Sequence, residues 1–329
     1  MILSKNNILQ NKFYKALCAL LICVLALSGC AKTQEPLRVI TLKGPTAMGM
    51  APMIEGADDS DDARFEVAAA PDAVAPKLLK GEADFAAVPA NLAATLYQKS
   101  EGKIQVVAIN TLGVLYLTER GEQVHSLKDL AGKTIVASGK GSTPEYALNF
   151  LLQSAGVSPD QVSIEWKSEH TEVVSALAQD ASLIGLLPEP FVTVAKSKMN
   201  DLRTAIDLNA EWDKTQEGME NPSSMVMGVL VGRKDALTDT KRVQKFLKKY
   251  EESIQKVNQD PKDAAEDIGK LDIVPQAVAE KAIPKCNIRY YSGEEMKTML
   301  SGFLKVLADQ NPKAIGGQMP ADDFYWIGK

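Results

Sequence analysis

Short apolar segments alternate with amphipathic ones between residues 37 and 198, which predicts an α/β fold. In the first half, strands are expected at 37–42, 65–69, 84–88 and 104–110, with helices at 47–54, 73–80 and 92–98. A second set has strands at 133–137, 162–166 and 183–187 and helices at 144–155, 171–179 and 189–198. Short apolar strands alternating with helices are typical of mainly parallel sheets that helices cover on both faces.

The remainder of the chain is expected to be mostly helical. Residues 208–222 are polar and include Trp212, so they are predicted to form a loop. An apolar strand is expected at 224–231, and a second extended apolar stretch is expected at 113–118. Helices are predicted at 239–257, 261–271, 275–282 and 293–310.

The N-terminal segment has the organisation of a secretory signal. Three lysines precede a mostly apolar run at 16–27, which small residues follow as far as Cys30. The run is shorter than the roughly 20 apolar residues that span a membrane. Leu27-Ser28-Gly29-Cys30 resembles the bacterial lipobox, so residues 1–29 are expected to be a cleaved lipoprotein signal peptide and Cys30 the lipidated N-terminus. The alternative is an uncleaved membrane anchor that ends in a cysteine by chance.

Charge narrows the range of partners. The formal net charge is −5, and removal of residues 1–29, which hold three lysines and no acid, makes it −8. A negative body argues against nucleic acid, or an anionic lipid surface, as the main partner. Residues 30–36 are expected to be a lipidated tether before a globular body that begins at residue 37.

Cysteine and histidine usage predicts neither a metal site nor a cofactor. Cys18 and Cys23 lie in the signal segment, so a lipidated Cys30 would leave Cys286 with no disulfide partner. Cys286 is expected to be a buried small hydrophobe, with a reactive thiol as the alternative. His125 and His170 are distant in sequence from each other and from any cysteine pair, and no zinc-binding spacing occurs.

Three short motifs carry a family resemblance. They are Gly81-Glu82-Ala83-Asp84 at a strand entry, Leu127-Lys128-Asp129-Leu130-Ala131-Gly132-Lys133, and Glu189-Pro190 at a strand-to-helix turn. In this order, and after a lipobox, they resemble the solute-binding proteins of ABC importers. The resemblance is to the group that includes binders of aliphatic sulfonates, taurine, nitrate and thiamine-pyrimidine precursors. It covers residues 37–329.

The resemblance implies a two-lobed type II periplasmic binding protein fold, each lobe a mainly parallel sheet flanked by helices, with two hinge crossovers. Lobe 1 would comprise 37–118 and 232–329, and lobe 2 would comprise 119–231. Residues 113–118 and 224–231 would be the hinge strands. The chain would be a monomer, held outside the cytoplasm on the cell membrane by its lipid. It would deliver a small solute to permease subunits driven by a separate ATPase.

Solutes in open α/β sheets bind beyond the carboxyl ends of the strands, where helix starts offer free N–H groups. The residues expected to bind the ligand are Gly44, Pro45, Thr46, Met48, Pro89, Asn91, Thr111, Ser138, Gly139, Ser142, Thr143 and Glu189. Aromatic residues are scarce in these loops, which favours a small polar or zwitterionic solute over a quaternary ammonium ion.

Each of these residues also has a purely structural explanation. Thr46, Asn91, Ser142 or Thr143 could cap a helix, and Met48 could pack in the core. The helix dipole alone would explain Glu189, while Lys140 and His170 are expected to be solvated loop residues.

Two other classes of function are alternatives to solute binding for transport. An enzyme is disfavoured, because no nucleophile-elbow motif or iron-binding Cys/His cluster occurs. A lipid-anchored sensor or adhesin without a transporter remains an alternative. The identity of the solute, among sulfonates, nitrate-like anions, amino acids and pyrimidine precursors, stays open.

Overall fold

The structure is a computed structural model that describes residues 35–58, 62–69, 71–219 and 222–328. The predicted signal peptide and Cys30 lie outside these residues. The chain divides into two units, Met1–Pro36 and Leu37–Lys329, and the second contains both sheets. No helix in the described part is both long enough and apolar enough to cross a membrane.

The first sheet has six strands in the order β11-β4-β10-β3-β1-β2. Their bounds are β1 Leu37–Leu42, β2 Ala63–Ala68, β3 Phe85–Pro89, β4 Ile104–Leu112, β10 Val226–Arg233 and β11 Ile288–Tyr291. Strand β1 pairs in parallel with β2 and β3, whereas β10 runs antiparallel between β3 and β4. Strands β1 to β4 therefore run in one direction, whereas β10 within the sheet and β11 at its edge run in the opposite direction.

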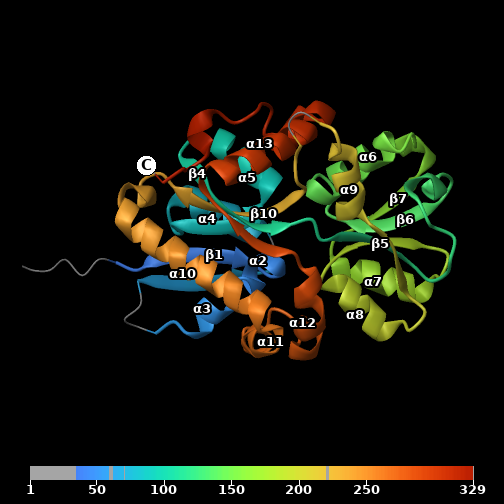
Figure 1. Cartoon of the computed structure of the whole chain (residues 1–329), viewed down its shortest axis with the longest axis horizontal. Helices are drawn as coiled ribbons and strands as arrows, with labels where there is room; N and C mark the ends of the chain where they lie inside the picture. Colours follow the sequence, from blue (N-terminus) through green and yellow to red (C-terminus); the bar gives the residue numbers. More distant parts are fainter. Residues whose placement is uncertain (1–34, 59–61, 70, 220–221, 329) are drawn as a thin grey trace, which may run out of the picture. The chain divides into compact units, whose positions relative to one another are not determined.

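Helices cover both faces of this sheet (Figure 1). Helices α4, α5 and α13 pack on one face, at Pro71–Lys80, Ala90–Lys99 and Gly293–Gln310. The other face carries α2, α3, α10, α11 and α12, at Pro45–Met48, Ala51–Glu55, Thr240–Gln259, Pro261–Lys270 and Gln276–Ala282.

The second sheet has five strands in the order β7-β6-β8-β5-β9. Their bounds are β5 Leu115–Glu119, β6 Thr134–Ser138, β7 Ser163–Lys167, β8 Ile184–Pro188 and β9 Arg203–Asp207. The helices that flank it are α6 Thr143–Ser154, α7 His170–Gln179, α8 Phe191–Lys198 and α9 Leu208–Gln216. Strand β6 pairs in parallel with β7 and β8, while β5 is antiparallel to both of its neighbours. Both sheets thus have the mainly parallel arrangement that the sequence predicts.

The two sheets divide the chain differently from the expected boundaries at 118 and 231. Strand β5 belongs to the second sheet although it begins at Leu115, before the expected boundary, and β10 belongs to the first although most of it lies before 231. The chain leaves the first sheet at Gly113 and Val114 and returns to it by way of residues 217–225. The chain therefore passes to the second sheet before β5 begins, and back to the first sheet before β10 begins.

The loop predicted at 208–222 is in fact helical from Leu208 to Gln216. The Asp207 carboxylate caps this helix by accepting the N–H groups of Asn209 and Ala210. Leu208 and Trp212 are buried one turn apart, so an apolar stripe fixes the helix despite its polar composition. Edge strands β9 and β11 were also missed by the sequence analysis.

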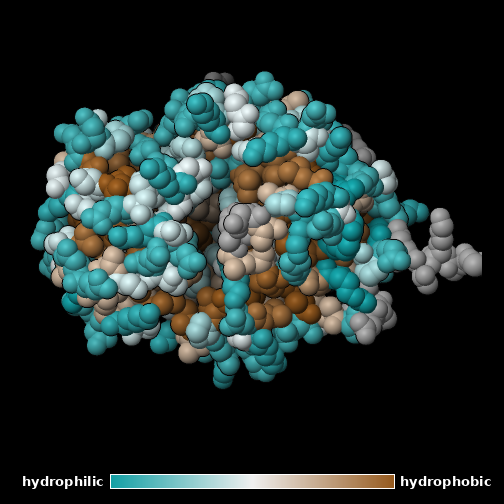
Figure 2. Space-filling model, turned by 180° about the vertical axis from the view of Figure 1, so that it is seen from behind, coloured by the Kyte–Doolittle hydropathy of each residue, from teal (hydrophilic) through white to brown (hydrophobic). Residues whose placement is uncertain are grey.

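The interior consists of three hydrophobic clusters. The largest contains residues of both sheets, and the Trp212 ring packs within it against Phe150 of α6 and Phe303 of α13. Hydrophilic residues cover most of the face seen in Figure 2, and apolar residues gather around the hollow near its middle. Apolar packing therefore continues from the helices of one sheet to those of the other.

Candidate functional site

The residues predicted to bind the ligand lie where five strands end and their following segments begin. Gly44, Pro45, Thr46 and Met48 follow β1, Pro89 and Asn91 join β3 to α5, and Thr111 lies near the end of β4. Ser138, Gly139, Ser142 and Thr143 connect β6 to α6, and Glu189 follows β8. The carboxyl ends of strands from both sheets supply this set, as the fold predicts.

A hydrogen bond between Asn91 and Thr143 joins the predicted site residues that follow the first sheet to those that follow the second. The Thr143 hydroxyl donates to the amide oxygen of Asn91 over 3.1 Å, and the Asn91 amide nitrogen donates to the Ala314 carbonyl over 3.3 Å. Asn91 is 6% exposed and Thr143 1%. Neither side chain caps its own helix, so the structural explanation offered by the sequence does not hold for these two.

The loop between β6 and α6 is held by bonds within itself. Ser142 Oγ donates to the Gly139 carbonyl over 2.6 Å, and the Gly141 N–H donates to the Glu145 carboxylate over 2.5 Å. Gly139 has a φ of +85°, and a Cβ there would lie 2.8 Å from Ser142 Oγ. The turn therefore requires glycine, and its conformation presents the start of α6, with Lys140 exposed.

Ser138 and His170 form a second polar pair. Ser138 Oγ lies 2.5 Å from Nδ1 of His170, whose ring packs on Phe191 with centroids 4.7 Å apart. Burial lowers the pKa of His170 to about 4, so the imidazole is neutral at neutral pH. The expectation of a solvated loop histidine is wrong, because His170 begins α7, is half-buried, and has its ring held by Ser138 and packed on Phe191.

Glu189 is a buried carboxylate, 1% exposed, at the start of α8. It accepts the N–H of Thr193 over 3.1 Å, and its own N–H donates to the Val114 carbonyl over 3.0 Å. Burial raises the pKa of Glu189, while the bonds from Thr193 and the charges of Lys285 and Lys196 oppose the rise. The hydrogen bond from the Thr193 N–H, at the start of α8, therefore explains in part why the Glu189 carboxylate lies here.

Cys286 lies beside this group. Its side chain is fully buried, and burial together with the charge of Glu189 raises the pKa of the thiol well above its usual value. A protonated, enclosed thiol is a packing residue, as the sequence favoured.

Thr46 and Met48 have structural roles in the first sheet. The Thr46 hydroxyl donates back to the Leu42 carbonyl over 2.8 Å, so it does not cap α2, for which Gly44 is the N-cap residue. Met48 and its neighbour Met50 are both fully buried in one cluster. Met48 therefore packs in the core of the first sheet, and its contact with a solute stays a prediction.

Asn110 is a residue of this region that the sequence analysis did not single out. Its amide oxygen accepts the Thr111 hydroxyl over 3.0 Å, and the side chain is 1% exposed. Its amide nitrogen lies near the Tyr250 hydroxyl, and neither atom has a well-formed hydrogen bond within the described residues. A polar residue at the end of an otherwise apolar strand was the signal that could have identified it.

Three cavities elsewhere are lined by other residues. The largest, about 870 Å³, lies between α6, α9 and α13, and the others measure about 410 and 40 Å³. None of the three is lined by a residue predicted to bind the ligand. No cluster of three or more potential metal ligands occurs among the described residues.

The architecture is that of the periplasmic binding protein fold. An ABC transporter structure from Parabacteroides distasonis is 25% identical, has a TM-score of 0.76, and the match covers 88% of this chain and 98% of that one. The periplasmic aliphatic sulphonate binding protein SsuA from Escherichia coli is 15% identical with a TM-score of 0.70, covering 89% and 92% of the two chains. A ligand-binding component of an ABC-type import system from Staphylococcus aureus is 18% identical with a TM-score of 0.64, covering 89% and 97%.

Sequence comparison defines the family. The NMT1/THI5-like family model matches residues 62–264, so this chain belongs to that family. Among curated proteins, none matches the chain.

Proposed function

We propose that this chain is the extracytoplasmic solute-binding lipoprotein of an ABC importer. Its two lobes would close on a small organic or anionic solute, of the sulfonate, nitrate-like or vitamin-precursor class. The protein would then deliver the solute to the permease, which a separate ATPase drives. Family membership and the likeness to transport-associated binding proteins support this function, which is binding without catalysis.

The observation that carries the proposal is the hydrogen bond between Asn91 and Thr143. It joins the start of α5, which follows the first sheet, to the start of α6, which follows the second. A solute that contacts both helix starts interacts more strongly with the closed arrangement than with a separated one. Such differential contact is what drives hinge closure in two-lobed binding proteins.

Local charge supports a solute with an anionic group. The positive charges of Lys285 and Lys196 act on the Glu189 carboxylate and oppose the rise of its pKa. These two cations lie in the surroundings of one buried carboxylate, and the neutral His170 adds no charge. Glu189 is then available to a positive or N–H group on the same solute, as in a zwitterion.

The proposed lobes follow the two sheets. Lobe 1 would comprise residues 37–112 and 226–329, and lobe 2 residues 115–216, with the hinges at 113–114 and 217–225. We further propose that Cys30 carries the lipid anchor and that the protein acts as a monomer. Replacement of Cys30 by Ser should move the protein from the membrane fraction to the soluble fraction, and unchanged membrane retention would overturn the anchor.

A thermal-shift screen of residues 31–329 tests the binding function. The panel comprises alkanesulfonates, taurine, nitrate, amino acids and aminopyrimidine vitamin precursors. A ligand that binds only the folded state raises the melting temperature, by an amount that grows with concentration. One responsive class supports the proposal, and no response to any class at millimolar concentration contradicts it. A permease and ATPase encoded beside the protein would support import, whereas a neighbouring histidine kinase would support the sensor role.

A further inference from the structure

A cation-rich groove of about 410 Å³ lies at the edge of the first sheet remote from the predicted ligand site. It is lined by Leu78, Leu79, Lys80, Gly81, Ser100, Lys103, Ile104, Arg233, Lys234 and Asp235. Four of these side chains are cationic and one is acidic. This local excess contrasts with the net negative charge of the whole chain.

Two of the four cations are already paired. Arg233 forms an ion pair with Asp235, and Lys234 forms one with Asp323 over 2.6 Å. The ammonium groups of Lys80 and Lys103 are exposed and bond to no other side chain in the described part of the protein. The groove therefore presents two unpaired positive charges to the solvent.

An exposed leucine accompanies these charges. Leu79 is 44% exposed and is one of two large hydrophobic side chains on the described surface that are exposed. Gly81 has a φ of +77°, and a Cβ there would lie 1.9 Å from a guanidinium nitrogen of Arg233, so the guanidinium rests on the Gly81 backbone. Apolar and cationic groups thus lie together on a fixed part of the backbone.

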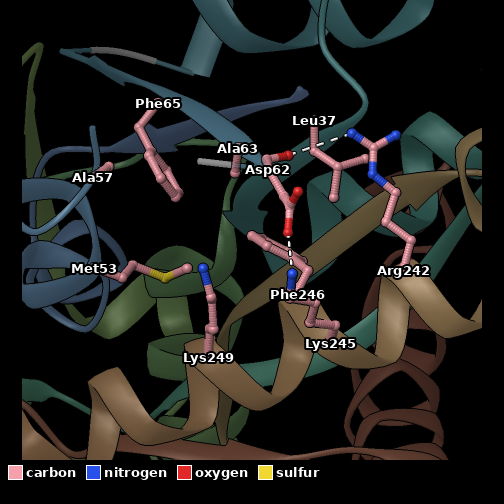
Figure 3. A pocket seen from close by; sticks show the side chains of 10 residues that line it. All are labelled: Leu37, Met53, Ala57, Asp62, Ala63, Phe65, Arg242, Lys245, Phe246 and Lys249. Carbon is pink, nitrogen blue, oxygen red and sulfur yellow. Dashed lines mark hydrogen bonds and ion pairs between the residues drawn. The ribbon is translucent and has the colours of Figure 1, made fainter. Parts of the chain in front are cut away.

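The sheet topology brings the start of the globular unit to the same edge. Strand β1 begins at Leu37 and β4 at Ile104, while the antiparallel β10 ends at Arg233. Only β3 separates β1 from β10, which corresponds to about 10 Å between them. Figure 3 shows Leu37 beside Asp62, toward which Arg242 and Lys245 of α10 are directed.

The sequence limits how far this edge can be from a lipid anchor. Leu37 follows Cys30 by seven residues, and a fully extended chain of that length spans at most about 25 Å. A lipid on Cys30 would keep the edge close to the membrane surface. At physiological salt the Debye length is about 8 Å, so the acidic surface farther away is largely screened from that contact.

We propose that this edge, through Lys80, Lys103 and Leu79, docks on anionic lipid headgroups. That this edge faces the membrane rests on the lipid anchor of the proposed function. The attraction between the lysines of the groove and anionic headgroups does not depend on that anchor. The negative net charge of the chain makes an anionic membrane an unfavourable partner for the protein surface as a whole. The groove is an exception, because cationic side chains are concentrated there. Lipid contact would hold the tethered protein in one orientation beside the membrane.

Co-sedimentation of residues 31–329 with vesicles tests the proposal. This fragment contains the entire unit Leu37–Lys329 with its three hydrophobic clusters, and circular dichroism confirms its folding before use. We expect binding to equimolar phosphatidylglycerol and phosphatidylcholine at low salt, and much weaker binding to phosphatidylcholine alone. Each lysine near an anionic surface contributes about fivefold to partitioning, so the double variant Lys80→Gln, Lys103→Gln should lose about 25-fold.

The matched control is the double variant Lys128→Gln, Lys281→Gln, which removes two exposed lysines away from the groove. It should bind vesicles as the wild type does. Equal loss in both variants, or no wild-type binding to anionic vesicles, would overturn the proposal. Binding of an acidic peptide without vesicle binding would overturn it in favour of a protein partner. The vesicle experiment does not test the lipid anchor, because residues 31–329 lack Cys30. The anchor is tested separately, by the fractionation of the Cys30→Ser variant.

Discussion

The Thr143 hydroxyl donates a hydrogen bond of 3.1 Å to the amide oxygen of Asn91, although the two residues are 52 positions apart. They begin helices that follow strands of different sheets. The bond is buried, and the other end of the Asn91 amide is held by the Ala314 carbonyl. Asn91 is therefore fixed from both sides, at a point where a helix that follows the first sheet contacts a helix that follows the second.

Replacement of Thr143 by Val should destabilise the protein. The substitution preserves shape but leaves the buried Asn91 oxygen without its donor, which costs about 1–3 kcal/mol. Urea denaturation measures the change. Thr95→Val is the control, because the Thr95 hydroxyl bonds within its own helix, and it should change stability by less than about 0.5 kcal/mol. Equal effects of both variants would argue that the contact between the starts of α5 and α6 contributes little to stability.

Gly228 should tolerate no side chain. A Cβ at this position in β10 would lie 2.4 Å from the Asn110 amide oxygen and 2.9 Å from Thr46 Cγ2. Gly228→Ala should therefore destabilise the protein by about 1–3 kcal/mol and displace the ends of β1 and β4. Gly121→Ala is the matched control, since a Cβ there meets nothing within 4 Å. A Gly228→Ala variant as stable as the control would contradict the close packing described here.

Stability should depend on pH through His170. Its pKa is lowered to about 4 by burial, against 6.5 ordinarily, so the unfolded chain binds this proton more readily than the folded protein does. The resulting stability is complete above pH 6.5 and is lost as the pH falls towards 4, amounting to at most about 3 kcal/mol.

Nuclear magnetic resonance titration of the His170 ring measures this pKa directly. Because burial is the cause, Ser138→Ala should leave the midpoint near 4, whereas Phe191→Ala, which opens one side of the ring, should raise it. A wild-type midpoint near 6.5 would show that the ring is solvated.

Glu189 should give the opposite pH dependence. Its pKa is raised chiefly by burial, so the folded state disfavours the charged carboxylate, and this group's contribution falls as the pH rises through its titration range. The Glu189→Gln variant keeps an acceptor for the Thr193 N–H but carries no charge. As the pH rises, the free energy of unfolding of the variant should therefore increase relative to that of the wild type. A constant difference would mean that burial does not govern this carboxylate.

Most of the fold could be predicted from the sequence, because buried strands and amphipathic helices impose clear hydrophobic periods. The exceptions have physical causes. Strands β9 and β11 lie at sheet edges and are half-exposed or short, so their apolar pattern is weak. Helix α9 is polar on most of its surface and is fixed by Asp207 and by the burial of Trp212.

The site was less predictable than the fold. The sequence identifies which loops follow strands, but not which side chains meet across the sheets. Nothing local connects Asn91 with Thr143, or encloses His170 against Phe191. These contacts depend on how helices from distant parts of the chain pack. Asn110 is different, because its polar side chain in a mostly apolar strand was a local signal.

The most direct test of the central claim is calorimetric titration with the compound that gives the largest thermal shift. If the solute binds between the starts of α5 and α6, Asn91→Ala and Thr143→Ala should each weaken its Kd at least about tenfold, equivalent to about 1.4 kcal/mol. The control variant Thr95→Ala, on the same helix as Asn91, should bind as the wild type does. An unchanged Kd in both site variants would contradict binding between the two lobes at this position.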